Sequence, residues 1–196
     1  MKFHEHIIRV GEPGLPGPPR EDFWRGVVAF AKRPEAFYGE IASSELGAEE
    51  SGENGERSFT RVVRFQSGGL AFEERVVLDD KKHAYRTFFK GDAERPASDF
   101  SIELAEPEPG SLFVRFTYNE EVVSGAPILP PMLAGLRKQA YEAKDMQVVE
   151  GILQFPRARL KSFACEGRIS VLHFFLRAQQ LQGAAGVRFL IETVSI

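Results

Sequence analysis

Hydrophobic and polar residues alternate with a period of two over much of the middle of the chain, from Ser58 to Val123. The alternating segments are 59–65, 70–78, 83–89, 100–104 and 112–118. Short connections rich in glycine, proline or charged residues separate several of them, at 68–69, 79–82 and 106–110. A period of two is typical of strands with one buried face, and short connections join antiparallel neighbours. The pattern therefore predicts an antiparallel meander.

The residues before this meander predict one strand and two short helices. Phe3–Val10 has the composition of a strand, and Gly11–Arg20 is a turn-rich loop. Glu21–Arg33 has its apolar residues at helical spacing and carries the single tryptophan, Trp24. Pro34 ends this helix and can begin a second one over Glu35–Glu40, because proline is tolerated at a first helical position. Gly47–Glu56 is polar, and we expect a mobile hairpin tip there.

The residues after the meander predict one long helix. Prolines at 127, 130 and 131 break the chain, and apolar residues then return at steps of three and four. These residues are Leu133, Leu136, Ala140, Ala143 and Met146. We therefore expect an amphipathic helix of about 20 residues or more that begins at Pro131 and closes the unit at Phe155.

Composition limits the class of protein. The chain has 196 residues, of which 43% are hydrophobic, with 17 phenylalanines, so one domain can bury a sizeable core. A net charge of −3 gives no electrostatic reason to expect a nucleic-acid partner. The sequence shows neither a signal peptide nor an apolar stretch of the roughly 20 residues that span a bilayer. We expect a soluble, cytoplasmic protein without a membrane span, and the oligomeric state stays open.

The charge balance changes at Pro156. Residues 157–196 contain six basic and two acidic residues, a net charge of +4, so residues 1–156 carry −7 of the total of −3. All twelve prolines lie at or before Pro156, whereas the only cysteine, Cys165, lies after it. A single cysteine excludes an internal disulfide and a zinc finger. We expect a domain over residues 1–155 and a C-terminal extension over residues 156–196, whose structure and role the sequence does not indicate.

Three arginines, Arg61, Arg75 and Arg115, interrupt apolar strands and can bind a carboxylate or a phenolate through two hydrogen bonds. Each can instead pair with a glutamate on the outer face of the sheet. Arg61 shares the alternation face of Phe59, Val63 and Phe65 and therefore needs a partner, which can be Glu74 or a ligand.

Histidines give weaker signals. His4 and His6 point to the same face of a strand, but the sequence indicates no third ligand, so we expect no metal site. His83 and Tyr85 share a strand face and can act as acid and base, although a pair at the rim of the sheet after the turn at 79–82 is favoured. Cys165 lacks any nucleophile motif, and no phosphate-binding loop or dinucleotide fingerprint is present. We expect no cofactor.

Several motifs resemble one known family in consistent order. Trp24-Arg25-Gly26-Val27 followed by Arg33-Pro34-Glu35-Ala36-Phe37 resembles the "WxGL … RPxxF" helix pair of the AtaL-like family, with Val27 where leucine is typical. Three later segments, Arg64-Phe65, 106–118 and 140–149, also resemble that family. The resemblance covers about residues 3–153, and residues 156–196 have no counterpart in the family pattern.

The AtaL-like family is part of the START-like (SRPBCC, Bet v 1-like) superfamily. The resemblance implies an α+β helix-grip fold, in which a curved antiparallel β-sheet wraps around a long C-terminal helix and two short helices follow the first strand. It also implies a central cavity and, in some members, a role in secondary metabolism. It carries no catalytic signature to numbered positions here, so the catalytic residues are unknown and enzymatic activity is uncertain.

Three functions follow as hypotheses. The first is binding of an apolar or aromatic small molecule, lipid-like or polyketide-like, between the sheet and the C-terminal helix. The second is a cyclase, dehydratase or isomerase that acts on a polyketide-like intermediate, and the third is a structural or partner-binding domain with a filled interior. The predicted ligand-binding residues are Trp24, Phe37, Arg61, Phe72, Tyr85, Arg115, Phe116 and Tyr118.

Overall fold

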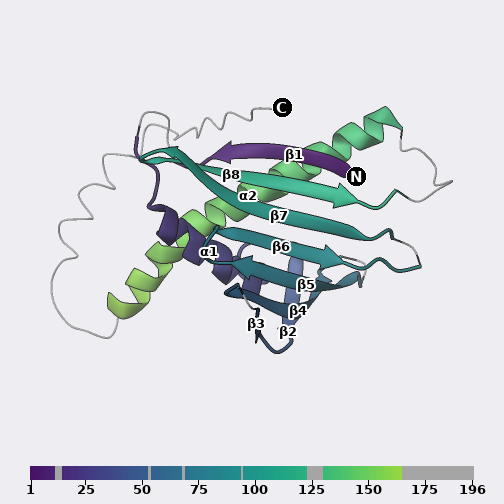
Figure 1. The fold of residues 1–196 in the computed structure, drawn as a ribbon, viewed down its shortest axis with the longest axis horizontal. Coiled ribbons are helices and arrows are strands. Elements are labelled where there is room, and N and C mark those ends of the chain that lie inside the picture. Colours follow the sequence, from purple (N-terminus) through teal and green to yellow (C-terminus); the bar gives the residue numbers. More distant parts are fainter. Residues whose placement is uncertain (12–14, 53, 68, 94, 123–129, 165–196) are drawn as a thin grey trace.

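The computed structural model describes residues 1–11, 15–52, 54–67, 69–93, 95–122 and 130–164. Strand β1 (Lys2–Arg9) comes first, followed by helix α1 (Arg20–Lys32) and a single 3-10 turn, Pro34–Ala36. Seven further strands and one long helix complete the order (Figure 1). They are β2 (Ile41–Leu46), β3 (Glu50–Ser51), β4 (Glu56–Phe65), β5 (Ala71–Asp79), β6 (Ala84–Phe89), β7 (Ser98–Glu108), β8 (Ser111–Glu120) and α2 (Pro131–Ala164).

The strands of the described residues form one antiparallel sheet, in the order β1-β8-β7-β6-β5-β4-β2, with β3 paired to β4. The predicted meander therefore runs from β4 to β8 between sequence neighbours, as short connections require. Strand β1 pairs with β8, so the first and last strands lie side by side (Figure 1). Residue Ile8 of β1 thus pairs with Val114 of β8, more than a hundred positions later in the chain.

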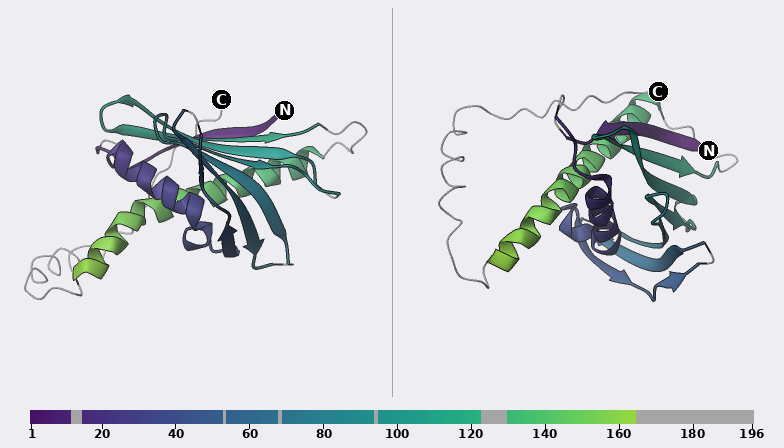
Figure 2. Two further views of the ribbon diagram at one scale, coloured as in Figure 1. Left: turned by 60° about the horizontal axis from the view of Figure 1, so that its bottom comes forward. Right: turned by 60° about the vertical axis from the view of Figure 1, so that its left-hand side comes forward.

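Both helices lie on the same side of the sheet, which curves around them (Figure 2). Two acidic residues in the first turn of α1, Glu21 and Asp22, interact favourably with the helix dipole, and Pro34 follows directly after the C-cap residue Arg33. The predicted arrangement, a curved antiparallel sheet around a long C-terminal helix, is what the structure shows. The expected fold class is confirmed.

The core lies between the sheet and the two helices. Its members include Ile8, Val27, Val76, Leu112, Val114 and Val148, all of which are completely or almost completely buried. Residues from β1, α1, α2 and the central strands thus share one cluster. Burial of these side chains holds the long helix against the sheet.

Two local predictions differ from the structure. The second helix is limited to the 3-10 turn Pro34–Ala36, because the chain must straighten to enter strand β2 at Ile41. Strand β2 was not predicted, since its sequence, Ile-Ala-Ser-Ser-Glu-Leu, lacks alternation and the strand lies at an edge of the sheet. The expected hairpin tip is also shorter, because Glu50 and Ser51 pair with β4 as strand β3.

The predicted apolar face of the long helix was correct only in part: Met146 packs against the core, but the residues before it do not. Leu133 and Leu136 are exposed, and Ala143 is exposed as well. The first turns of α2 do not reach the core. Its buried residues begin after Leu136 and are Asp145, Val148, Val149 and Ile152. This shift places a charged residue, Asp145, in the interior.

Helix α2 continues past Phe155, where we expected the unit to close, as far as Ala164. The rest of the expected extension, residues 165–196 with Cys165, lies outside the described residues. No helix in the described part of the chain is long and apolar enough to cross a membrane.

Candidate functional site

A cavity of about 540 Å³ lies between the sheet and helix α2. Its walls come from the start of β2, from β4 to β8, from helix α2 and from the end of α1. Aromatic and aliphatic side chains make up most of the lining, among them Phe30, Ile41, Val63, Phe65, Phe72, Phe89, Phe100 and Val148. Small-molecule sites in proteins have volumes of roughly 300–1,000 Å³ and a mainly apolar lining, so this cavity has the size and character of a binding pocket.

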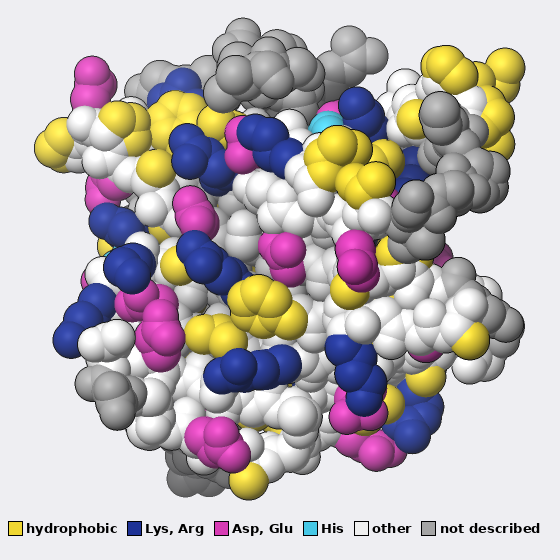
Figure 3. All heavy atoms as spheres, turned by 45° about the vertical axis from the view of Figure 1, so that its right-hand side comes forward, with side chains coloured by type: hydrophobic (Ala, Val, Ile, Leu, Met, Phe, Trp, Pro, Cys, Tyr) yellow, Lys and Arg dark blue, Asp and Glu magenta, His cyan; other side chains and the backbone are white. Residues whose placement is uncertain are grey.

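The surface of the protein has mixed charge. On the face shown in Figure 3, acidic and basic side chains alternate around small hydrophobic groups, and neither sign forms a continuous patch there.

Four of the eight predicted ligand-binding residues line the cavity: Arg61, Phe72, Tyr85 and Tyr118. The other four lie elsewhere in the structure. Phe37 and Phe116 pack in the core, where Phe37 contacts Phe30 and Phe155, and Phe116 stacks on His6 and Phe100. Arg115 is half exposed and lies beside Glu103. It therefore follows the alternative in which the arginine pairs with a glutamate on the outer face of the sheet.

Trp24 also lies outside the cavity. Its indole Nε1 donates a 2.9 Å hydrogen bond to Asp80 Oδ1, and Arg57 binds the same carboxylate. His83 packs against the Trp24 ring, with its Nε2 atom 3.0 Å from Glu21 Oε1. His83 lies just before β6, with a positive φ of 53°, and is not among the residues that line the cavity, whereas Tyr85 is. The structure therefore separates the two members of the suggested His83–Tyr85 acid–base pair.

The first polar group of the cavity is centred on the buried Arg61. Its guanidinium donates to Glu74 through Nε, at 2.9 Å, and also through Nη2. It donates further to the carbonyl oxygen of Ala31 at 2.6 Å and to the hydroxyl of Tyr85 at 2.8 Å. Of the two partners that the sequence left open for Arg61, the structure shows Glu74.

These bonds define the chemistry of Tyr85. Its hydroxyl oxygen accepts from Arg61, which leaves the hydroxyl hydrogen for another acceptor. Burial raises the pKa of Tyr85 above its ordinary value, so the phenol keeps its hydrogen at neutral pH. Tyr85 is thus placed to donate a hydrogen bond to a ligand oxygen in the cavity.

The second polar group joins Tyr118 to Asp145 of helix α2. The Tyr118 hydroxyl donates a 2.6 Å hydrogen bond to Asp145 Oδ2, and Lys144 Nζ lies 3.1 Å from Asp145 Oδ1. Asp145 is completely buried, and this burial raises its pKa, whereas Lys144 and the Tyr118 hydroxyl act in the opposite direction. Burial also raises the pKa of Tyr118, and Asp145 adds to that effect.

The two tyrosines therefore offer opposite hydrogen-bonding groups to the same cavity. The Tyr118 hydroxyl donates its hydrogen bond to Asp145, so only its oxygen lone pairs are available to a ligand. The Tyr85 hydroxyl accepts from Arg61, so its hydrogen is available for donation to a ligand. A ligand with one donating and one accepting group on an apolar framework matches this arrangement.

Three cations complete the lining and lie over aromatic rings. Arg95 lies 4.1 Å from the ring centre of Phe72, and Arg137 lies 4.3 Å from that of Phe3. Lys144 is 4.5 Å from Phe100 and 5.0 Å from Tyr118. Each cation is also paired with an acid, since Arg95 binds Asp92 and Arg137 binds Glu120. A lining that combines aromatic rings with cations favours aromatic ligands.

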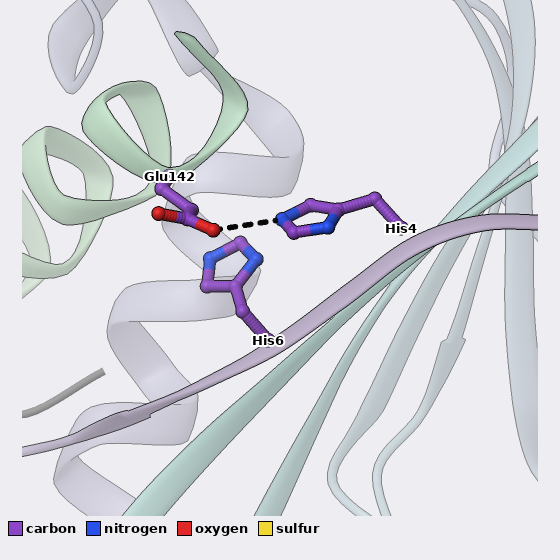
Figure 4. A group of neighbouring side chains, drawn as sticks. All are labelled: His4, His6 and Glu142. Atoms are coloured by element: carbon purple, nitrogen blue, oxygen red, sulfur yellow. Dashed lines mark ion pairs between the residues drawn. The ribbon is translucent and has the colours of Figure 1, made fainter. Parts of the chain in front are cut away.

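A cluster of histidines and carboxylates lies beside the cavity, where β1 packs on α2 (Figure 4). His4 Nε2 is 3.2 Å from Glu142 Oε1, and His6 Nε2 is 3.3 Å from Asp145 Oδ2. Burial, reinforced by the nearby His4, lowers the pKa of His6 to about 4. His4, His6 and Glu142 are the described residues that could hold a metal ion.

Sequence reasoning missed the helical half of the site. Asp145, Lys144 and Tyr141 all face the sheet, but none of them belongs to the apolar face that the sequence predicted for α2. A usable signal was present, because Lys144, Asp145 and Val148 lie three, four and seven positions after Tyr141, which places all four on one side of a helix. The buried side of a helix is normally apolar, so a side that carries a lysine and an aspartate was not predicted to face the core.

Solved structures share this fold at low sequence identity. A START superfamily protein from Mycobacterium smegmatis is 14% identical, with a TM-score of 0.54 over 78% of this chain and 97% of that one. The Zhui aromatase/cyclase from Streptomyces sp. R1128 is also 14% identical, with a TM-score of 0.51 over 84% and 98% of the two chains. The di-domain aromatase/cyclase StfQ of the steffimycin biosynthetic pathway is 13% identical, with a TM-score of 0.52 over 80% of this chain and 47% of that one.

No curated protein sequence matches the chain significantly. A family model does match it, over residues 16–153, and this family is described as acetylaranotin biosynthesis cluster protein L, or AtaL. The matched range runs from just before α1 to the part of α2 that faces the sheet, and it includes the cavity and both of its polar groups. The chain therefore belongs to the AtaL family, and it shares its fold with the START superfamily protein and the aromatase/cyclases named above.

Proposed function

We propose that this protein binds an apolar or aromatic small molecule, of the polyketide type, in the cavity between the sheet and α2. The observation that carries the proposal is an apolar cavity of about 540 Å³ with a hydroxyl donor, Tyr85, and a hydroxyl acceptor, Tyr118. A purely structural domain would need a filled interior, so the cavity favours ligand binding over the third hypothesis. The family name adds support, because it refers to a biosynthetic gene cluster.

The charge state of the site suggests how the ligand is recognised. Arg61 is neutralised by Glu74, and all three of its nitrogens donate to protein atoms, so it orients Tyr85 and does not anchor a ligand carboxylate directly. Hydroxyl and carbonyl groups on aromatic rings fit this site better than a carboxylate, because the cavity offers neutral hydroxyls beside cations already paired with acids.

Native mass spectrometry tests binding directly. The protein is expressed in a metabolite-rich host, and a bound compound that is released on denaturation is expected. Ala140 lines the cavity, so Ala140→Trp should abolish the adduct by filling the space, whereas Ala143→Trp, on an exposed part of the same helix, should not. An adduct that survives Ala140→Trp would place the ligand elsewhere. Absence of binding to any polycyclic phenol in titrations of the purified protein would favour the structural role.

The Tyr118–Asp145 pair favours a second function at the same site, catalysis of a cyclisation, dehydration or isomerisation. In such a reaction the Tyr118 oxygen removes a proton from a carbon next to a substrate carbonyl, while the Tyr118 hydrogen passes to Asp145 Oδ2. The electron pair of the broken C–H bond moves to the carbonyl oxygen, and the enolate accepts a hydrogen bond from Tyr85. The aromatase/cyclases that share the fold give this reaction class its support.

Substitution of the pair separates catalysis from binding. Tyr118→Phe removes the proton carrier but keeps the ring, so product formation should fall by about 10²–10⁴-fold, the usual contribution of general acid–base groups. Affinity should fall by no more than about tenfold, because the ligand loses a single hydrogen bond. Asp145→Asn should act in the same direction. If neither variant changes product formation from a compound that binds, the catalytic function fails and the binding function stands.

A further inference from the structure

We propose that His4, His6 and Glu142 form a binding site for a divalent transition-metal ion, best matched by Zn²⁺, which links strand β1 to helix α2. The sequence places only the two histidines together. The fold adds the third ligand, because α2 crosses β1 and brings Glu142 beside both of them.

The positions of the ligand atoms support the site. His4 and His6 are two residues apart on β1 and therefore point to the same side of the strand, toward α2 (Figure 4). One ring nitrogen from each histidine and one oxygen of Glu142 all lie within 4.8 Å of one another. An ion with bonds of about 2.0–2.2 Å to such atoms fits between them after small side-chain rotations.

The hydrogen bonding of the histidines points to a missing partner. His4 Nε2 and both ring nitrogens of His6 are buried, and none of them forms a hydrogen bond with the residues that the structure describes. Two of these atoms, His4 Nε2 and His6 Nε2, have only the carboxylate contacts given above, whereas His6 Nδ1 has neither a hydrogen bond nor an ion pair among the described residues. Buried polar atoms in folded proteins nearly always have a partner, so His6 Nδ1 calls for a bound species. The His6 side chain is only 2% exposed, so bulk water does not supply that partner.

The chemistry of the ligands selects the ion. Two imidazoles and one carboxylate are a common zinc set that leaves a fourth position open, whereas magnesium and calcium prefer oxygen atoms alone. Metal-bound histidines usually donate their second N–H to a carboxylate, and Asp145 Oδ2 lies 3.3 Å from His6 Nε2. Asp145 can thus fix the orientation of the His6 ring through the nitrogen that does not bind the metal. An ion can reach the site from solvent beside Glu142, whose side chain is 29% exposed.

The proposal is tested on the untagged full chain in a Cys165→Ser background, which removes the only thiol. After removal of metal by a chelator and dialysis against micromolar Zn²⁺, elemental analysis should find a single zinc ion per chain. The melting temperature should rise by about 5–10 °C at a hundredfold excess over the dissociation constant, since the ion binds only the folded state. Replacement by Co²⁺ should give the visible absorption of a histidine-bound ion.

Three variants decide whether the ion binds at this site. His4→Gln and Glu142→Gln change residues that are partly exposed, so both should fold, and each should weaken zinc binding by at least about tenfold. His83→Gln removes a histidine that pairs with an acid elsewhere in the structure and should leave zinc binding unchanged. Failure of the parent protein to retain zinc, or equal retention by the His4 and Glu142 variants, would overturn the proposal.

Discussion

The buried guanidinium of Arg61 is the most highly connected charge in the interior, and its removal should be costly. Arg61→Met leaves the Glu74 carboxylate and the Tyr85 hydroxyl without their donor in an apolar cavity. We expect a loss of about 3–5 kcal/mol in the free energy of unfolding, measured by urea denaturation. The double variant Arg61→Met/Glu74→Leu should recover most of this loss, because it removes the uncompensated charge as well. A single variant as stable as the parent would contradict the burial of this pair.

Tyr118 and Asp145 should be energetically coupled in the same way. A double-mutant cycle of Tyr118→Phe and Asp145→Leu isolates their hydrogen bond, because each variant removes one partner, and we expect a coupling of about 1–3 kcal/mol since both groups are buried. As a control, Tyr118→Phe and Trp24→Phe should be additive within about 0.5 kcal/mol, since Trp24 belongs to the separate Asp80 group. Additivity in both cycles would show that the Tyr118–Asp145 bond contributes nothing to stability.

At the scale of single residues, the sequence indicated half of the site. Arg61 was identified because an arginine on an apolar strand face needs a partner, and that reasoning needs only the period of two. Asp145 could not be found in this way, because its burial depends on how α2 lies against β1 and β8. A charge on a helix is exposed by default, so only the fold shows that Asp145 meets Tyr118 and His6.

At the scale of elements, the packing of α1 on α2 depends on the absence of a side chain at Gly26. A Cβ atom at this position would lie 2.5 Å from Ile152 Cγ2, so the two helices meet most closely there. We expect Gly26→Ala to destabilise the protein by about 1–3 kcal/mol in thermal or urea unfolding, because overpacking outweighs the gain in helix propensity.

Gly135 gives the matched control for this substitution. It lies in α2, and a Cβ atom there would meet no other atom within 4 Å. Gly135→Ala should therefore stabilise the protein by about 0.5–1 kcal/mol through helix propensity alone. Equal effects of the two substitutions would mean that the helices do not approach each other at Gly26.

The prediction of elements was accurate where side chains alternate and poor where tertiary contacts decide. Strands β4 to β8 were recognised because each has one buried face, whereas β2 is an edge strand with serines at its centre. The start of α2 was marked by Pro131. Its buried face was not, because Leu133 and Leu136 follow helical spacing without touching the core.

At the scale of the whole molecule, the fold was expected because the order of a strand, a helix, a meander and a closing helix, together with several motifs, resembles a known family. The contact between β1 and α2 was implied by that fold, but the side chains that meet there were not. Glu142 approaches His4 from the other end of the chain, and no spacing in the sequence links the two. Features that combine distant segments, such as the cavity and the proposed metal site, therefore required coordinates.

The last prediction concerns the boundary of the domain. The described core ends with Ile152, Leu153 and Phe155, and Phe155 packs on Phe37. We propose that a chain truncated after Phe155 folds as the parent does, because it keeps all of these contacts, and that its melting temperature changes by less than about 2 °C. Truncation after Gly151 removes the buried Ile152 and both neighbours, so its melting temperature should fall by about 6 °C or more. A large loss in the longer chain would instead mean that residues 156–196 contribute to the same folding unit.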